Sequence, residues 1–81
     1  MAASLSNLGR LYREQKRFRE SEDSFSRALA IYDKVPGASP KRVAQTLTEY
    51  AKLLRATNRA AEAEKLEARA KAMKDEQKRA Q

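Results

Sequence analysis

The sequence predicts an all-α protein made of two tandem antiparallel helix hairpins, four helices in all. Apolar residues recur at helical spacing, and seven positions of the first half return 42 residues later. These positions are Leu5, Leu8, Gly9, Tyr12, Ser21, Phe25 and Ala28, followed by Leu47, Tyr50, Ala51, Leu54, Ala63, Glu67 and Ala70. Repeats of this length are typical of stacked arrays, in which each unit buries its apolar face on its neighbour and leaves a long surface for a partner.

The first repeat is expected over residues 3–34. Leu5, Leu8, Leu11 and Tyr12 form one apolar stripe, which predicts a helix from Ala3 to about Gln15. A short polar turn follows, and a second helix is expected from Phe18 to about Lys34. The apolar or small side chains on its buried face are Phe18, Ser21, Phe25, Ala28, Leu29 and Tyr32.

Residues 35–39 are predicted to form the loop between the repeats, since both prolines and one of the two glycines of the chain lie in the segment 35–40. Ser39 and Pro40 resemble an N-cap and a first helical residue, with the serine hydroxyl expected to accept a hydrogen bond from a helix amide. The second repeat, residues 40–73, then begins with a helix from Pro40 to about Thr57.

The last helix is expected to begin at Ala60, after a turn at Asn58 and Arg59. Its apolar stripe consists mostly of alanine, so it suits a solvated cap at the end of a stack. Its basic end, residues 74–81, is predicted to fray.

The composition leaves disorder open as an alternative. Only thirteen of the 81 residues are Leu, Ile, Val or Phe, and the net charge is +7. The helical spacing and fifteen alanines favour a folded chain with a thin core.

Enzymatic function is not expected. The chain has no histidine and no cysteine, so the commonest general base and the usual zinc ligands are missing, and two glycines cannot build a phosphate-binding loop. Paired carboxylates such as Glu20 and Asp23 are interpreted as solvated surface groups. We expect no catalytic residue, no cofactor and no metal.

No apolar run is long enough to cross a membrane and no secretory signal starts the chain, so a cytoplasmic location is expected. The positive charge favours acidic partners. Nucleic acid is disfavoured because aromatic residues do not alternate with the basic ones, and membrane binding because the last helix has a weak apolar face.

The spacing from Leu5 to Ala28 resembles that of the tetratricopeptide repeat, in its long form of about 42 residues found in kinesin light chain. This resemblance implies that small residues at Gly9 and Ala51 allow close helix approach, and that Phe25 fills the space before the next repeat. Two residues depart from the family pattern. Ser21 replaces an alanine, and Glu67 replaces a phenylalanine, so a third repeat is not expected to pack on the last helix in the usual way.

The resemblance also implies a concave groove lined by the first helix of each repeat. The corresponding residues are Ala3, Ser6, Asn7, Arg10, Arg13, Glu14, Gln45, Thr48, Glu49, Lys52 and Arg55. Asn7 is expected to hold a peptide backbone, and Arg10, Arg13, Lys52 and Arg55 to contact the carboxylates of an acidic peptide. The alternative interpretation of these cations is a solvated surface, as on any helical chain of this charge.

Two functions follow from this sequence. The first is a scaffold module that binds an extended, acidic peptide of another protein in the groove. The second is self-association, by stacking of ends or exchange of hairpins, because Leu5, Leu11 and Phe18 expose apolar surface at the N-terminal side and repeat arrays usually need three or more units. A piece of a longer array and an engineered repeat are both left open.

Overall fold

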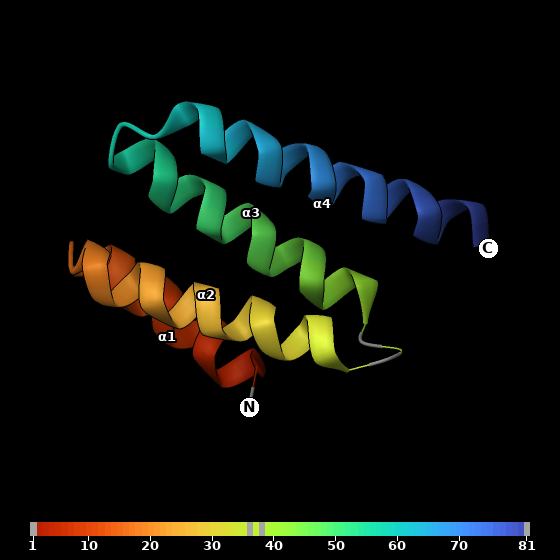
Figure 1. The fold of residues 1–81 in the computed structure, drawn as a ribbon, viewed down its shortest axis with the longest axis horizontal. Coiled ribbons are helices and arrows are strands. Elements are labelled where there is room, and N and C mark those ends of the chain that lie inside the picture. Colours follow the sequence, from red (N-terminus) through yellow and green to blue (C-terminus); the bar gives the residue numbers. More distant parts are fainter. Residues whose placement is uncertain (1, 36, 38, 81) are drawn as a thin grey trace.

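The computed structural model describes residues 2–35, 37 and 39–80, with side chains through Asp75. Its helices are α1 (Ala2–Glu14), α2 (Phe18–Lys34), α3 (Pro40–Ala56) and α4 (Ala60–Ala80), and the described residues contain no strand. They form two antiparallel hairpins, one above the other (Figure 1). The all-α fold class is therefore confirmed. Both ends of α1, α2 and α3, and the start of α4, lie within one residue of the expected ones.

Parts of the predicted loop and chain ends lie outside the described residues: Met1, Pro36, Ala38 and Gln81. The fraying of residues 74–81 stays a prediction, since α4 is helical through Ala80.

Both hairpins turn in the same way. Lys16 and Asn58, which are 42 residues apart, adopt left-handed backbone conformations with φ of 64° and 62°. The next amide in each turn donates to a carbonyl five residues back, from Arg17 to Tyr12 and from Arg59 to Leu54, both at 2.8 Å. This is the pattern of a Schellman C-cap, which satisfies the last carbonyls of α1 and α3. The repeat therefore extends to backbone conformation.

The start of α3 differs in one detail from the prediction. Ser39 is the N-cap and Pro40 the first helical residue, as expected, but the serine hydroxyl makes no capping hydrogen bond. The Ser39 carbonyl instead accepts the Val43 amide at 3.0 Å. Helix initiation here rests on that backbone bond and on the fixed φ of proline, which has no amide to leave unpaired.

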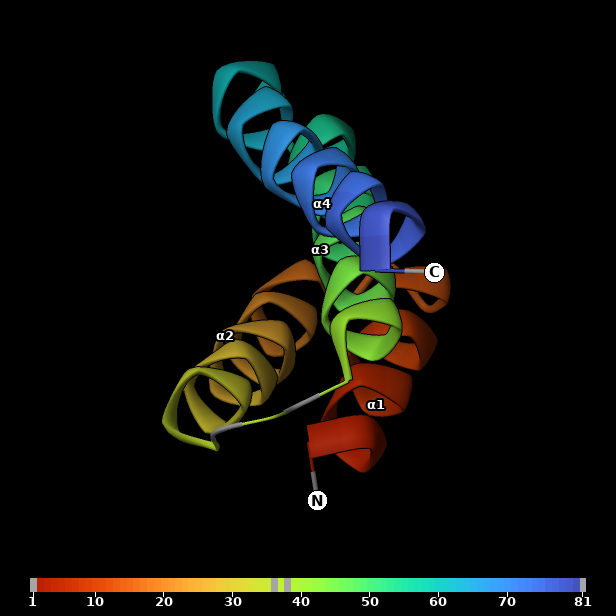
Figure 2. The same cartoon turned by 90° about the vertical axis from the view of Figure 1, so that its right-hand side faces the viewer.

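The core is centred on α3, which packs against α4, α2 and α1. Figure 2 shows α1 and α2 side by side beneath α3, with α4 beyond it. Phe25 of α2 is fully buried and stacks on Tyr50 of α3, with ring centroids 5.7 Å apart. Phe25 thus fills the space between the two repeats, as predicted. The buried residues shared by α3 and α4 are Val43, Ala44, Leu47, Ala51, Leu54, Ala63 and Ala70.

Gly9 of α1 lies directly against Phe25 of α2. A Cβ atom at this position would come within 2.8 Å of the Phe25 ring, so only glycine fits without a shift of the ring. The buried Ser21 hydroxyl donates to the Gly9 carbonyl at 2.6 Å. The serine that departs from the family pattern therefore adds a hydrogen bond between α1 and α2, where an alanine could form none.

Ion pairs on the surface join the two hairpins. Arg59, in the turn before α4, pairs with Glu22 of α2 and with Glu62 of α4. Arg69 of α4 pairs with Asp33 of α2 at 3.0 Å. These side chains are largely exposed, so each pair contributes little to stability and mainly orients the hairpins.

Candidate functional site

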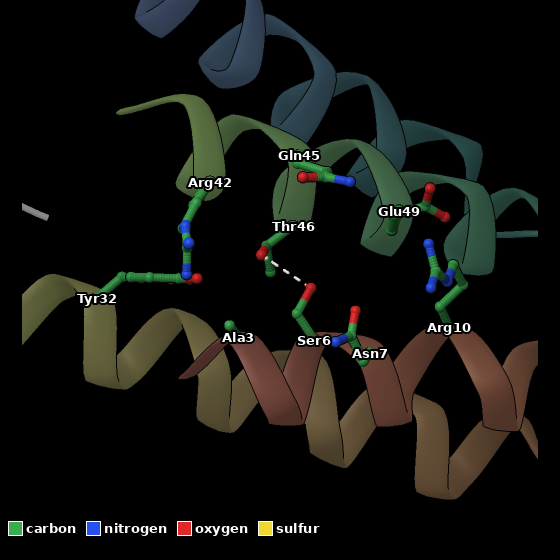
Figure 3. A pocket seen from close by; sticks show the side chains of 9 residues that line it. All are labelled: Ala3, Ser6, Asn7, Arg10, Tyr32, Arg42, Gln45, Thr46 and Glu49. Atoms are coloured by element: carbon green, nitrogen blue, oxygen red, sulfur yellow. Dashed lines mark hydrogen bonds between the residues drawn. The ribbon is translucent and has the colours of Figure 1, made fainter. Parts of the chain in front are cut away.

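A cavity of about 300 Å³ opens between α1 and α3. Figure 3 shows its lining side chains, which are Ala3, Ser6, Asn7, Arg10, Tyr32, Arg42, Gln45, Thr46 and Glu49. The α1 residues recur at three- and four-residue steps, so they share one face of that helix, and the α3 residues do the same. The cavity is therefore a polar groove between the first helices of the two hairpins.

Ser6 and Thr46 hold the two walls of the groove together. The Thr46 hydroxyl donates to the Ser6 hydroxyl at 3.0 Å, drawn as a dashed line in Figure 3. Thr46 is buried and Ser6 half-buried, so this contact lies at the base of the groove. This hydrogen bond aligns Ser6 of α1 with Thr46 of α3. The alignment in turn determines which side chains of the two helices face each other across the groove.

Of the predicted groove residues, six line the cavity: Ala3, Ser6, Asn7, Arg10, Gln45 and Glu49. Tyr32, Arg42 and Thr46 were not among those predicted. Arg42 lies three residues before Gln45 on the same face of α3, so helical periodicity carried to the start of the helix would have found it. Tyr32 comes from α2, and only the packing of the hairpins brings it to the groove.

Glu49 is held by two cations that had been expected to face a ligand. Arg13 Nη1 lies 2.5 Å from the Glu49 carboxylate and 3.1 Å from its backbone oxygen. Lys52 Nζ lies 3.7 Å from the other carboxylate oxygen. The Arg13 and Glu49 side chains are only 18% and 16% exposed. Arg13 and Lys52 thus compensate the negative charge in the groove wall and do not line the cavity.

Arg55 also pairs within the chain. Its guanidinium donates two hydrogen bonds to Glu67 of α4, at 3.0 and 2.6 Å. These bonds are the main reason that the pKa of Glu67 is lowered and that of Arg55 raised. The contact lies between α3 and α4, so Arg55 does not line the groove.

Arg10 and Arg42 remain as the cations that line the groove. Both are exposed, and neither forms an ion pair with a carboxylate in the part of the chain whose side chains are described. Figure 3 shows them at opposite ends of the groove, with Asn7 and Gln45 between them. An extended anionic segment would find a positive charge at each end and amide groups along its length.

A second surface lies on the outer side of the first hairpin. Leu5, Leu8 and Tyr12 of α1 and part of α2 line a hollow of about 510 Å³. The α2 residues are Arg19, Glu20, Asp23, Ser24 and Arg27. Leu8 is 40% exposed and the neighbouring Leu11 49% exposed. The apolar surface expected at the N-terminal side is therefore present, with a rim of mixed charge.

Two helix hairpins in tandem with a groove between their first helices define a helical repeat scaffold. The family model of the tetratricopeptide repeat matches residues 1–76, so the chain belongs to the tetratricopeptide repeat family. Proteins of this family generally mediate protein–protein interaction and are typically scaffolds without enzymatic activity. No curated protein and no solved structure gave a significant match. Among the described residues, no helix is both long and apolar enough to cross a membrane.

Proposed function

We propose that this chain is an interaction module that binds an extended acidic segment of another protein in the groove between α1 and α3. The observation that carries the proposal is a polar groove whose own carboxylate, on Glu49, is already compensated by Arg13, while Arg10 is left for a ligand. The groove therefore offers a net positive surface to a peptide, and acidic segments complement it.

Each predicted site residue then has a distinct role. Asn7 donates to and accepts from the peptide backbone, and Arg10 pairs with a peptide carboxylate. Arg13 and Lys52 act indirectly by compensating Glu49. Arg55 stays with Glu67 and contributes to the contact between α3 and α4.

The test is a calorimetric or fluorescence-anisotropy titration of acidic and neutral peptides of equal length. Acidic peptides should bind more tightly, and Arg10→Glu should weaken them by about tenfold or more, because the change removes one attraction and adds a repulsion. Lys71→Glu is the matched control, since it makes the same charge change at an exposed position of α4 that lines neither the groove nor the hollow on the first hairpin. Equal affinity for acidic and neutral peptides, with no effect of Arg10→Glu, would refute the proposal.

We also propose that the repeats are of the long, kinesin-light-chain-like type. The support is the 42-residue spacing, which holds for the apolar positions and for the two left-handed turn residues.

A second candidate function, self-association, is favoured by the exposed Leu8 and Leu11. The occupant we propose is a second copy of the same hairpin face, related by a twofold axis. Its rim carries two cations, Arg19 and Arg27, and two anions, Glu20 and Asp23, so the patch can complement itself. The α4 side is less suitable, because Glu67 stands there in place of an aromatic residue and is paired with Arg55.

Light scattering after size exclusion tests this second function. A dimer that strengthens with concentration and is lost in Leu11→Asp would support it. Val35→Asp is the control, because Val35 is also 49% exposed but lies at the end of α2, away from this face. A folded monomer at every concentration would rule out the dimer and leave the peptide groove unaffected.

A further inference from the structure

Arg10 and Arg42 set a spacing for the carboxylates that the groove accepts. Resting on the proposed peptide-binding function, we infer that the groove selects an extended segment with two acidic side chains four residues apart, one for each arginine. Arg42 lies one turn before the expected groove residues of the second repeat and makes this selection possible.

The surroundings of Arg42 suit a ligand contact. The residue is on the first turn of α3, is exposed, and lines the groove together with Tyr32. In Figure 3 its side chain extends from α3 across the end of the groove toward Tyr32. The described carboxylates all lie beyond ion-pair distance of it, so its charge is available without the cost of breaking an internal pair.

The separation of the two arginines follows from helix geometry. The bond between Ser6 and Thr46 places these two residues side by side, and α1 and α3 run in the same direction along the groove. Arg10 is four residues after Ser6, and Arg42 is four residues before Thr46. At a rise of about 1.5 Å per residue, their backbones are separated by roughly 12 Å along the groove.

An extended peptide matches this separation at one spacing. It advances about 3.3 Å per residue and turns alternate side chains to the same face. Residues i and i+4 therefore lie about 13 Å apart on one face, whereas i and i+2 reach only about 7 Å and i and i+6 about 20 Å. Residues i and i+3 or i+5 point to opposite faces. Between the two acids, Asn7 and Gln45 are placed to bond the peptide backbone.

The experiment uses peptides of identical composition and otherwise neutral sequence that contain two aspartates. The second aspartate follows the first at position i+1, i+2, i+4 or i+6. Affinity for the full chain is measured by fluorescence anisotropy. The four-residue spacing should bind about 3- to 10-fold more tightly than the others. Arg42→Gln should remove this preference. Lys41→Gln removes the same charge from the preceding residue of α3. This variant should keep the preference for the four-residue spacing, because Lys41 does not line the groove.

Circular dichroism of both variants verifies that they keep the wild-type helix content. Equal binding of all spacings, or an equal effect of Arg42→Gln and Lys41→Gln, would overturn the inference. If Arg10→Glu still weakened acidic peptides in that case, the proposed function would stand. If no acidic peptide bound the wild-type chain, the inference and the proposed function would both be wrong.

Discussion

The two hairpins share a sequence pattern but differ in which of its residues they bury. Leu11 of α1 is 49% exposed, whereas its counterpart Leu53 of α3 is 1% exposed. Leu5 is half-buried, whereas Leu47 is fully buried. The cause is position in the stack, because α1 and α2 cover one side of α3 and nothing in the described chain covers the outer side of α1.

The second helices differ in the opposite sense. Phe25 of α2 is fully buried against Tyr50, whereas its counterpart Glu67 of α4 is at the surface and pairs with Arg55. In a repeat protein, then, the position within the repeat determines which side of the helix a side chain faces. Whether that side chain is buried depends on whether another repeat packs against that side. The residue types match these environments, since the apolar phenylalanine is buried and the charged glutamate is at the surface.

Replacing Phe25 should produce the largest difference between the hairpins. Phe25→Ala leaves a cavity at the junction of α1, α2 and α3 and should cost about 3–5 kcal/mol in the free energy of unfolding, a large share of the total for a small domain. Glu67→Ala removes only an exposed ion pair and should cost far less than that. Urea denaturation followed by circular dichroism measures both. Similar losses would show that the two positions are equivalent after all.

A second pair of variants compares the first helices. Leu53→Ala should cost about 2–4 kcal/mol because the side chain is buried, and Leu11→Ala less than about 1 kcal/mol because half of it already contacts water. Both are measured by urea denaturation at several protein concentrations, and the values expected here apply to the lowest. A large loss for Leu11→Ala that grows with protein concentration would mean that a second copy of the chain covers α1. Such a result would support the self-association proposal.

Most of the fold was predictable from the sequence. The 42-residue spacing predicted the hairpins, and the family resemblance implied Phe25 at their junction and the close helix approach at Gly9. The left-handed conformation of Lys16 was not, because lysine carries no local preference for it. The capping bond of the Ser39 hydroxyl was predicted and is absent, since a side-chain rotamer is not fixed by residue type.

The groove was predicted less completely, for a physical reason. Residue type and helical spacing show which cations face the groove side of a helix, but ion pairs depend on which helices become neighbours. Arg13 meets Glu49 across 36 residues of sequence, and Arg55 meets Glu67 across a turn. Arg42 was overlooked because the groove positions that the resemblance implied for the second repeat begin at Gln45, one turn after it.

Gly9 offers a smaller test, confined to the first hairpin. Gly9→Ala gains about 1 kcal/mol in helix propensity but forces the tightly packed Phe25 ring to shift, so a net loss of about 1–2 kcal/mol is expected. In a Phe25→Leu background the clash is relieved, and the same change should be neutral or stabilising. A double-mutant cycle measured by urea denaturation isolates this coupling. An equal cost in both backgrounds would mean that the close approach to Phe25 is not what requires glycine.

The smallest expected effect compares the two turns, and it is a gain. Lys16 and Asn58 have nearly the same positive φ, but a lysine side chain is strained there, whereas asparagine tolerates this conformation. Lys16→Gly should therefore stabilise the chain by about 0.5–1 kcal/mol, and Asn58→Gly by only a few tenths, after the added flexibility of the unfolded chain is subtracted. Gln15→Gly is the control, because the preceding residue has no positive φ and should lose stability. If thermal denaturation showed Lys16→Gly to be no more stable than Gln15→Gly, the positive φ of Lys16 would not strain the chain, and this explanation of the difference between the two turns would be wrong.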